Sequence, residues 1–217
     1  MVKIPLVIIG AGGFGREVHD IVEAVNAETD MFDFLGFVDD HVTKPELLAG
    51  RGRILGGDDI LPTLPSNTQY VISIGDARIR RSIDQSATEL GLRAAVLVHP
   101  SATRGMHRVE LGPGTIICSH VSLTTDITLG RHVHLNLNAT IGHDAVLKDY
   151  VTVNPGATIS GNVVLEEGVM IGTGASVNQG MTVGKESVIG AGAAVVRSIP
   201  AGVTAIGIPA KAIGPRL

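Results

Sequence analysis

The most regular feature of the sequence is an aliphatic residue at every sixth position of its second half. These fifteen positions are Leu111, Ile117, Leu123, Leu129, Leu135, Ile141, Leu147, Val153, Ile159, Leu165, Ile171, Val177, Val183, Ile189 and Val195. Four residues after most of them stands a small or apolar residue, and one residue after many of them stands Gly. A six-residue unit with two inward positions forms one short strand and one corner, and three such units close a triangular coil. The pattern therefore predicts an all-β left-handed parallel β-helix.

The first half of the chain alternates between apolar strand patterns and helical patterns. The expected strands are Leu6–Ile9, Phe34–Val38, Tyr70–Ile74 and Ala94–Val98, and the expected helices are Arg16–Val25 and Ala77–Leu90. Alternation of this kind predicts a small parallel sheet with crossover helices, an α/β Rossmann-like domain. Pro100 interrupts regular structure just after the last strand. We therefore expect a Rossmann-like domain over residues 1–97 and a β-helix with a C-terminal tail over residues 98–217.

Composition narrows the setting in which the protein works. Hydrophobic residues make up 44% of the 217 residues and aromatic residues only 3%, so the core must consist of aliphatic side chains. The net charge of −4 gives no reason to expect a nucleic-acid partner. The first apolar run is too short for a membrane span and lacks the pattern of a signal peptide. A single cysteine, Cys118, excludes an internal disulfide and fits a reducing compartment. We expect a cytoplasmic protein with no membrane partner.

A glycine-rich turn follows the first predicted strand. Its glycines, Gly10, Gly12 and Gly15, have the spacing that lets a backbone approach a phosphate at a helix N-terminus. Fewer than one hundred residues supply only about one half of a dinucleotide domain, so a single nucleotide is the expected ligand. Asp39-Asp40 and Gly75 follow the next predicted strands and are expected at the same crevice. The alternative is a tight turn beside a solvated acidic loop.

The pair His143-Asp144 is the strongest catalytic signal in the repeats. An imidazole beside a carboxylate can act as a general base, and the register places this pair near a corner of a coil. Acyl transfer from a thioester needs little more than one base and backbone N–H donors for the developing oxyanion. Cys118 has no histidine at a suggestive spacing, so we interpret it as a small packing residue rather than a nucleophile.

The other histidines of the repeats suggest neither a second base nor a metal. His120 and His132 fall in the fourth position of their hexads, where a solvated or locally hydrogen-bonded corner residue is expected. His132 and His134 could share a face, but the sequence offers no clear third ligand at zinc spacing. We therefore expect no metal.

Several segments together resemble one known family. They are the N-terminal GAGGFG, HPSA, IGHD within an unbroken hexapeptide helix, NPGATISGNV and the final IGIPAK. The combination is similar to the sialic-acid O-acetyltransferase and nucleotide-4-amino-sugar N-acetyltransferase family, and it covers nearly the whole chain. The resemblance implies a homotrimer that binds acetyl-CoA in the groove between neighbouring β-helices. It also implies a nucleotide amino sugar as the second substrate.

The resemblance assigns roles to individual positions. His143 is the implied base that takes a proton from the sugar amine, and Asp144 supports it in a slot where many relatives have Glu. The implied substrate-binding residues are Gly12, Gly13, Phe14, Asp39, Asp40, Gly75 and Asn136. The implied acetyl-CoA positions are Thr152, Gly161, Thr173 and Ala191, mostly through the backbone. Several relatives have His where this chain has Thr152, so no histidine contact to the cofactor is expected.

Three functions remain open from the sequence. The first is acetyl transfer to the 4-amino group of a nucleotide-linked deoxy sugar, with His143 assisting direct attack on the thioester. The second is O-acetylation of a sialic acid or another sugar hydroxyl, which IGHD does not distinguish from the first. The third is a non-enzymatic trimeric scaffold. The sequence also leaves the nucleotide open among UDP, GDP and dTDP.

Overall fold

Residues 3–216 are described in the computed structural model, and the chain forms two compact units, Met1–Pro100 and Ser101–Leu217. The division falls three residues beyond the boundary that we expected from the sequence. No helix within these described residues is both long enough and apolar enough to cross a membrane.

The first unit is a five-stranded parallel sheet with two long helices. Its elements are β1 (Ile4–Ile9), α1 (Gly13–Thr29), β2 (Phe32–Val38), the 3₁₀ helix η1 (Pro45–Leu48), β3 (Ile54–Gly56), the 3₁₀ helix η2 (Asp58–Thr63), β4 (Gln69–Ile72), α2 (Ala77–Glu89), β5 (Arg93–Ala94) and β6 (Leu97–Val98). Strand β3 and both 3₁₀ helices were missing from the sequence-based expectation. Strand β4, which corresponds to the third strand that we expected, ends at Ile72. Gly75 therefore lies in the loop before α2 and does not directly follow a strand.

The order of the sheet, β3-β2-β1-β4-β5, creates a switch point between β1 and β4. The chain leaves β1 toward β2 on one side and adds β4 on the other. Right-handed crossovers then place α1 and α2 on opposite faces of the sheet. Helix α1 contacts β1 and β2, and α2 contacts β4 and β5. Ligands of such folds bind beyond the carboxyl ends of the strands at this point.

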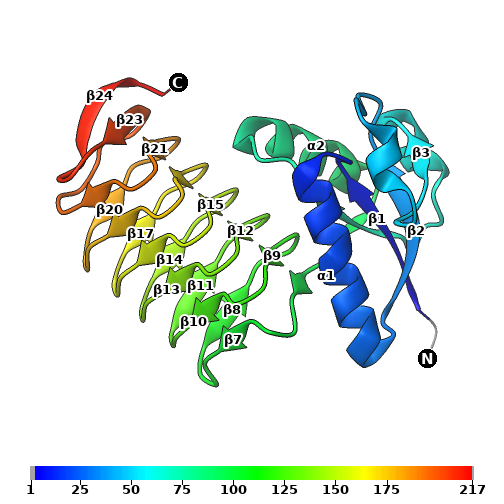
Figure 1. Cartoon of the computed structure of the whole chain (residues 1–217), viewed down its shortest axis with the longest axis horizontal. Coiled ribbons are helices and arrows are strands. Elements are labelled where there is room, and N and C mark those ends of the chain that lie inside the picture. Colours follow the sequence, from blue (N-terminus) through cyan, green and yellow to red (C-terminus); the bar gives the residue numbers. More distant parts are fainter. Residues whose placement is uncertain (1–2, 217) are drawn as a thin grey trace. The chain divides into compact units, whose positions relative to one another are not determined.

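The second unit is a stack of coils with three parallel sheets (Figure 1). We name each sheet after one of its strands. The β12 sheet includes β6, β9 (Ile116–Ile117), β12 (His134–Leu135), β15 (Thr152–Val153), β18 (Met170–Ile171), β21 (Val188–Ile189), β23 (Val203–Ile206) and the antiparallel β24 (Lys211–Pro215). The expected strand Ala94–Val98 is therefore divided, because β5 ends the five-stranded sheet and β6 pairs in this one. The β13 sheet has β7 (Thr103–Arg104), β10 (Ser122–Leu123), β13 (Thr140–Ile141), β16 (Thr158–Ile159), β19 (Ser176–Val177) and β22 (Ala194–Val195). The β14 sheet has β8 (Val109–Leu111), β11 (Ile127–Leu129), β14 (Val146–Leu147), β17 (Val164–Leu165) and β20 (Thr182–Val183).

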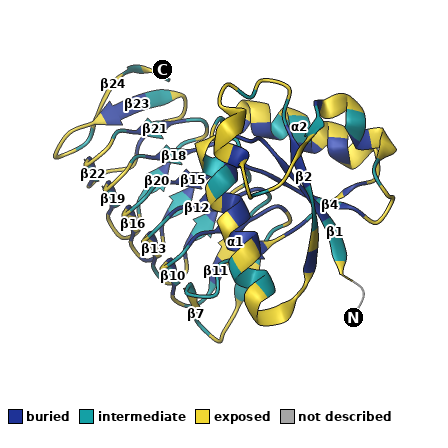
Figure 2. Cartoon of the chain, turned by 45° about the vertical axis from the view of Figure 1, so that its right-hand side comes forward, coloured by how far each residue is buried: buried dark blue, intermediate teal, exposed yellow. Residues whose placement is uncertain are grey.

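The predicted hexad register is confirmed by the packing of the coils. Residues eighteen apart pair in parallel, as Thr140 does with Thr158. All fifteen aliphatic positions lie in strands, and every one after Leu111 is at most 3% exposed. In Figure 2 the strands of the second unit are coloured as buried or intermediate, whereas many of the corners are exposed. The glycines in the second position allow close stacking, because a Cβ on Gly142 would lie 2.6 Å from the nitrogen of Gly161 in the next coil.

His132 is fully buried, so of the two environments that we expected for it, solvated or locally hydrogen-bonded, the solvated one is wrong. Its ring stacks on that of Tyr150, one coil further on, with centroids 5.9 Å apart and planes 3° from parallel. On the other side, a Cβ on Gly114 would come within 2.3 Å of the imidazole. The absence of a side chain at Gly114 therefore makes room for a ring inside the corner. His120 is exposed, as expected.

Candidate active site

Glycines shape the switch point of the first unit. Gly10 follows β1 at φ +102°, and a Cβ there would lie 2.8 Å from Ser73 Oγ. The Ser73 hydroxyl donates to the carbonyls of Ile9 and Gly10, which links the ends of β1 and β4. A Cβ on Gly15 would lie 2.3 Å from the Gly10 oxygen, so α1 can begin this close to the turn only with glycine. Gly10 and Gly15 are therefore required by the turn itself.

Gly12 and Gly13, by contrast, open onto space. Gly12 is the N-cap of α1, and no side chain caps the helix there. A Cβ on Gly12 would meet no other atom within 4 Å. Both glycines line a cavity of about 310 Å³ together with the basic Arg16 and Lys44, the imidazole of His41, and Asp39, whose carboxylate already accepts two backbone N–H groups. A helix N-terminus beside basic side chains favours an anion, such as a phosphate group.

A second and larger cavity of about 710 Å³ adjoins the same turn. It is lined by Ile9, Gly10, Gly12, Val38, Asp39, Asp40, His41, Asp58, Ser73, Ile74, Ile79, Ser82 and Ile83. The structure thus brings Gly12, Asp39 and Asp40 together, as the sequence suggested. The Asp39 carboxylate accepts hydrogen bonds from the backbone N–H groups of Ala11 and His41, both at 2.8 Å. The bond to Ala11 links the end of β2 to the glycine turn.

Asp58 is a lining residue that the sequence analysis missed. Parallel pairing of Val38 with Gly56 brings the turn after β3 beside the end of β2. A Cβ on Gly57 would lie 3.1 Å from the Asp40 carboxylate, and Asp58 follows directly. Partial burial, together with the negative charges of Asp40 and Asp39, raises the pKa of Asp58. The available signal was the segment ILGGDD, in which an apolar pair is followed by two aspartates, as Phe37-Val38 is followed by Asp39-Asp40.

Phe14 and Gly75 line neither cavity. Phe14 is half-buried in the first turn of α1. The carbonyl of Gly75 accepts a hydrogen bond from the Arg80 guanidinium at 3.1 Å. Their assignment to nucleotide binding remains a prediction.

His143 and Asp144 occupy the corner between β13 and β14, which we call the β13–β14 corner. Asp144 has φ +58°, and this local turn lets the two adjacent side chains meet. The distance from His143 Nδ1 to Asp144 Oδ2 is 2.7 Å, so the aspartate side chain is long enough to reach the ring. An ionised carboxylate can only accept, so Nδ1 carries the hydrogen, and in the neutral imidazole Nε2 then keeps its lone pair. Both side chains are about half exposed, at 49% and 54%.

Gly161 stands one coil above His143 at the same corner. A Cβ on Gly161 would lie 2.5 Å from both Cε1 and Nε2 of the imidazole. The backbone N–H of Asn162 donates to the His143 carbonyl at 2.8 Å, which fixes the two corners to each other. The basic nitrogen of His143 therefore lies directly over a backbone stretch that has no side chain. This is the position that the resemblance assigns to acetyl-CoA.

The remaining assigned residues lie on another part of each coil. Thr173 and Ala191 occupy equivalent places, eighteen residues apart, at the corner between the β12 and β13 sheets. Asn136 precedes the same corner, is 8% exposed, and donates to the Val153 carbonyl at 3.2 Å. Thr152 is buried in β15. Within one chain the assigned residues thus divide between two corners, and the whole set does not meet at one point.

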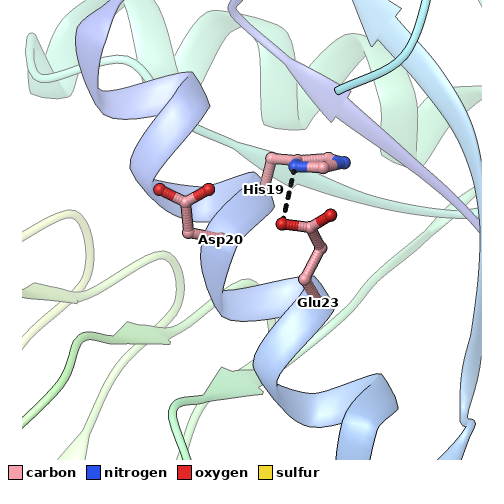
Figure 3. A group of neighbouring side chains, drawn as sticks. All are labelled: His19, Asp20 and Glu23. Atoms are coloured by element: carbon pink, nitrogen blue, oxygen red, sulfur yellow. Dashed lines mark ion pairs between the residues drawn. The ribbon is translucent and has the colours of Figure 1, made fainter. Parts of the chain in front are cut away.

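Three potential metal ligands, His19, Asp20 and Glu23, gather on α1 in the described part of the chain (Figure 3). Asp20 forms an ion pair with Arg51, whose positive charge opposes a cation at the same place. The His19 ring packs edge-on against Phe34 with centroids 4.7 Å apart. Burial lowers the pKa of His19, although the Glu23 carboxylate 3.7 Å away acts in the opposite direction. We interpret the group as packing and ion pairing that hold α1 in place.

Both units have counterparts in known proteins. Residues 5–87 match the family model described as PglD N-terminal domain. The acetyltransferase domain of PglB from Neisseria gonorrhoeae FA1090 superposes on 97% of this chain with a TM-score of 0.88 and 33% identity, and all of that domain is covered. This chain belongs to the same sugar acetyltransferase family. The predicted family is therefore confirmed, and so is the predicted fold class, an α/β Rossmann-like domain followed by a left-handed parallel β-helix.

Other family members are known with their ligands. A His-to-Asn variant of perosamine N-acetyltransferase from Caulobacter crescentus was solved with CoA and GDP-perosamine. It is 31% identical, has a TM-score of 0.89, and the match covers 97% of each chain. GDP-perosamine N-acetyltransferase from Escherichia coli O157:H7 is 34% identical over 149 residues. That match covers 65% of the present chain and 63% of the Escherichia coli protein, so the chain spans less than two thirds of that relative's length.

Proposed function

We propose that the protein transfers an acetyl group from acetyl-CoA to the 4-amino group of a nucleotide-linked deoxy amino sugar. The observation that carries this proposal is His143, whose Nδ1 is held by Asp144 while Nε2 lies over Gly161. The relatives support it, since one was solved with CoA and GDP-perosamine and another with acetyl coenzyme A.

In the proposed reaction the sugar amine attacks the carbonyl carbon of the thioester directly. Nε2 of His143 takes the proton from the attacking nitrogen as the C–N bond forms, while Asp144 stabilises the resulting imidazolium. The C–S bond then breaks, and the imidazolium can return the proton to the departing thiolate. Backbone N–H groups would bind the oxyanion. No covalent enzyme intermediate is required, which fits the burial of Cys118 inside the β-helix.

Acetyl-CoA is proposed to bind along Thr152, Gly161, Thr173 and Ala191, in a groove between neighbouring β-helices of a homotrimer. The division of these residues between two corners supports this arrangement. Side-by-side packing of three prisms would bring one corner of a protomer against a different part of its neighbour. A site built in this way uses both corners without requiring them to meet within one chain.

The nucleotide sugar is proposed to bind at the switch point of the first unit. The diphosphate fits the smaller cavity, where Gly12 and Gly13 begin α1 and Arg16 and Lys44 supply positive charge. Asp39 and Asp40 belong to the nucleoside end of the site. The contacts of Phe14 and Gly75 with the nucleotide, and of Asn136 with the sugar, complete the proposal.

The test is a thiol-release assay with acetyl-CoA and a panel of nucleotide-linked 4-amino sugars, followed by identification of the amide product. The variant His143→Ala should reduce kcat by about 10²- to 10⁴-fold, the range expected for loss of a general base. Its oligomeric state should stay unchanged. Near-normal turnover of this variant would overturn the mechanism.

The same assay separates the alternative functions. An O-acetyl product with sugar hydroxyl acceptors, and no amide, would favour the O-acetyltransferase. A scaffold would show no thermal stabilisation by millimolar acetyl-CoA and no thiol release. The single cysteine and the nucleotide-sugar substrate support a cytoplasmic location in this proposal.

A further inference from the structure

The larger cavity of the first unit has a chemical character that goes beyond holding a nucleotide. It adjoins the anion-binding turn, so a nucleotide with its diphosphate at Gly12 and Gly13 can extend its base into this space. We propose that this cavity selects guanine, and that Asp58, with Asp40, is the specificity-determining residue. This inference rests on the proposed function, because it assumes that a nucleotide sugar binds at the switch point.

Carboxylates line the cavity, and one of them, Asp40, lies 3.4 Å from the imidazole of the exposed His41. Asp39 accepts two backbone N–H bonds, which ties it to the glycine turn. Asp40 lies against Gly57, so the start of η2 brings Asp58 close to Asp40. Both Asp40 and Asp58 line the cavity. A ligand that fills this space meets the carboxylates of Asp40 and Asp58 as hydrogen-bond acceptors, beside the imidazole of His41.

Aliphatic side chains also line the cavity, with the hydroxyl groups of Ser73 and Ser82 among them. Ile74, Ile79 and Ile83 line it from the loop after β4 and the first turns of α2. Ile79 is 51% exposed, although it is a large aliphatic residue beside a cavity. A flat aromatic base placed against these side chains would remove apolar surface from water, a favourable change. The cavity is thus suited to a planar ring whose edge offers hydrogen-bond donors.

Among the common bases, guanine is the best match to a lining of carboxylates and aliphatic side chains. Its N1–H and exocyclic N2–H₂ are adjacent donors on one edge, and carboxylates act only as acceptors. Uracil and thymine offer a single N–H between two carbonyl oxygens, and these oxygens would face the carboxylates unfavourably. Adenine has an acceptor beside its one amino group. Charge-assisted hydrogen bonds of this kind therefore favour guanine over the other bases.

The decisive experiment is nucleotide binding to the full chain, measured by isothermal titration calorimetry without acetyl-CoA. The probes are GDP, UDP, dTDP and IDP, which is GDP without the exocyclic amino group. The wild type should bind GDP at least about 10-fold more tightly than IDP, UDP or dTDP, which corresponds to one lost charge-assisted bond. The isosteric variant Asp58→Asn should lose at least about 10-fold in GDP affinity and bind GDP and IDP nearly equally.

The matched control is Asp59→Asn, which removes the next carboxylate of η2 but does not line the cavity. This control should keep the wild-type preference for GDP. Equal binding of UDP and GDP by the wild type, or an unchanged GDP preference in Asp58→Asn, would overturn the inference while leaving a nucleotide-dependent enzyme intact. If none of the four nucleotides bound at millimolar concentration, the proposed nucleotide-sugar function would fail as well.

Discussion

The contact between Gly161 and His143 gives a sharp test of how the β-helix positions its base. We consider the substitution Gly161→Ala. The new Cβ would lie 2.5 Å from Nε2 and Cε1 of His143, whereas ordinary contacts of a Cβ begin near 3.4 Å. The imidazole must therefore move by about 1 Å. A misplacement of this size can reduce catalysis by about 10²-fold. We expect kcat to fall by this factor.

The backbone at Gly161 gives no reason for the variant to misfold. Its φ is not positive, and an alanine, Ala191, occupies the same hexad position five hexads further along the chain, at another corner. A matched control is Gly214→Ala, in β24 of the same unit, where a Cβ would meet nothing within 4 Å. Circular dichroism and the melting temperature of Gly161→Ala should stay close to those of the wild type.

The kinetic constants distinguish a displaced base from a blocked cofactor. Displacement of His143 lowers kcat, while a block of acetyl-CoA raises its KM with kcat unchanged. Combining Gly161→Ala with His143→Ala tests the coupling directly, since the second substitution should cost little more once the base is displaced. A Gly161→Ala enzyme with wild-type kcat would refute the idea that the bare backbone at this corner fixes the imidazole.

Three further predictions concern single carboxylates. Asp144→Asn keeps a residue that tolerates positive φ but leaves Nδ1 without its carboxylate, so kcat should fall by about 10- to 100-fold in steady-state kinetics, and an unchanged kcat would contradict the proposed role. Asp76 caps α2 by accepting from the N–H groups of Arg78 and Ile79, so Asp76→Ala should lower the free energy of unfolding by about 1 kcal/mol in urea titrations, whereas an unaltered midpoint would argue against the cap. Because the pKa of Asp58 is raised by burial and neighbouring aspartates, its charged form destabilises the fold. Asp58→Asn should therefore raise the melting temperature at pH 7, with a gain that disappears as the pH falls through the raised pKa toward that of an ordinary carboxyl; a gain that persisted at pH 3 would contradict this explanation.

The sequence predicted the β-helix well because every coil repeats the same physical requirement. An inward aliphatic residue recurs fifteen times, and only one register satisfies it. The Rossmann-like unit was predicted less completely, since β3 has three residues and no repeat to reveal it. Asp58 was missed for the same reason, because its place beside Asp40 depends on the pairing of β3 with β2. His132 was misjudged because its burial depends on Gly114 and Tyr150 in adjacent coils.

The backbone of the β13–β14 corner also explains how Asp144 can act as the hydrogen-bond partner of His143. The fourth position of every hexad from Arg108 to Gly192 has a positive φ. This backbone region favours Gly, Asn and Asp, and it is costly for most longer side chains. At such a corner the chain turns sharply from one sheet into the next, so adjacent side chains come together that would point apart on a strand. His143 and Asp144 are therefore paired by the same turn that closes the coil. The acid partner of the base is thus a product of the repeat geometry, and the glycine above it, Gly161, keeps the basic nitrogen open to the acyl donor proposed here.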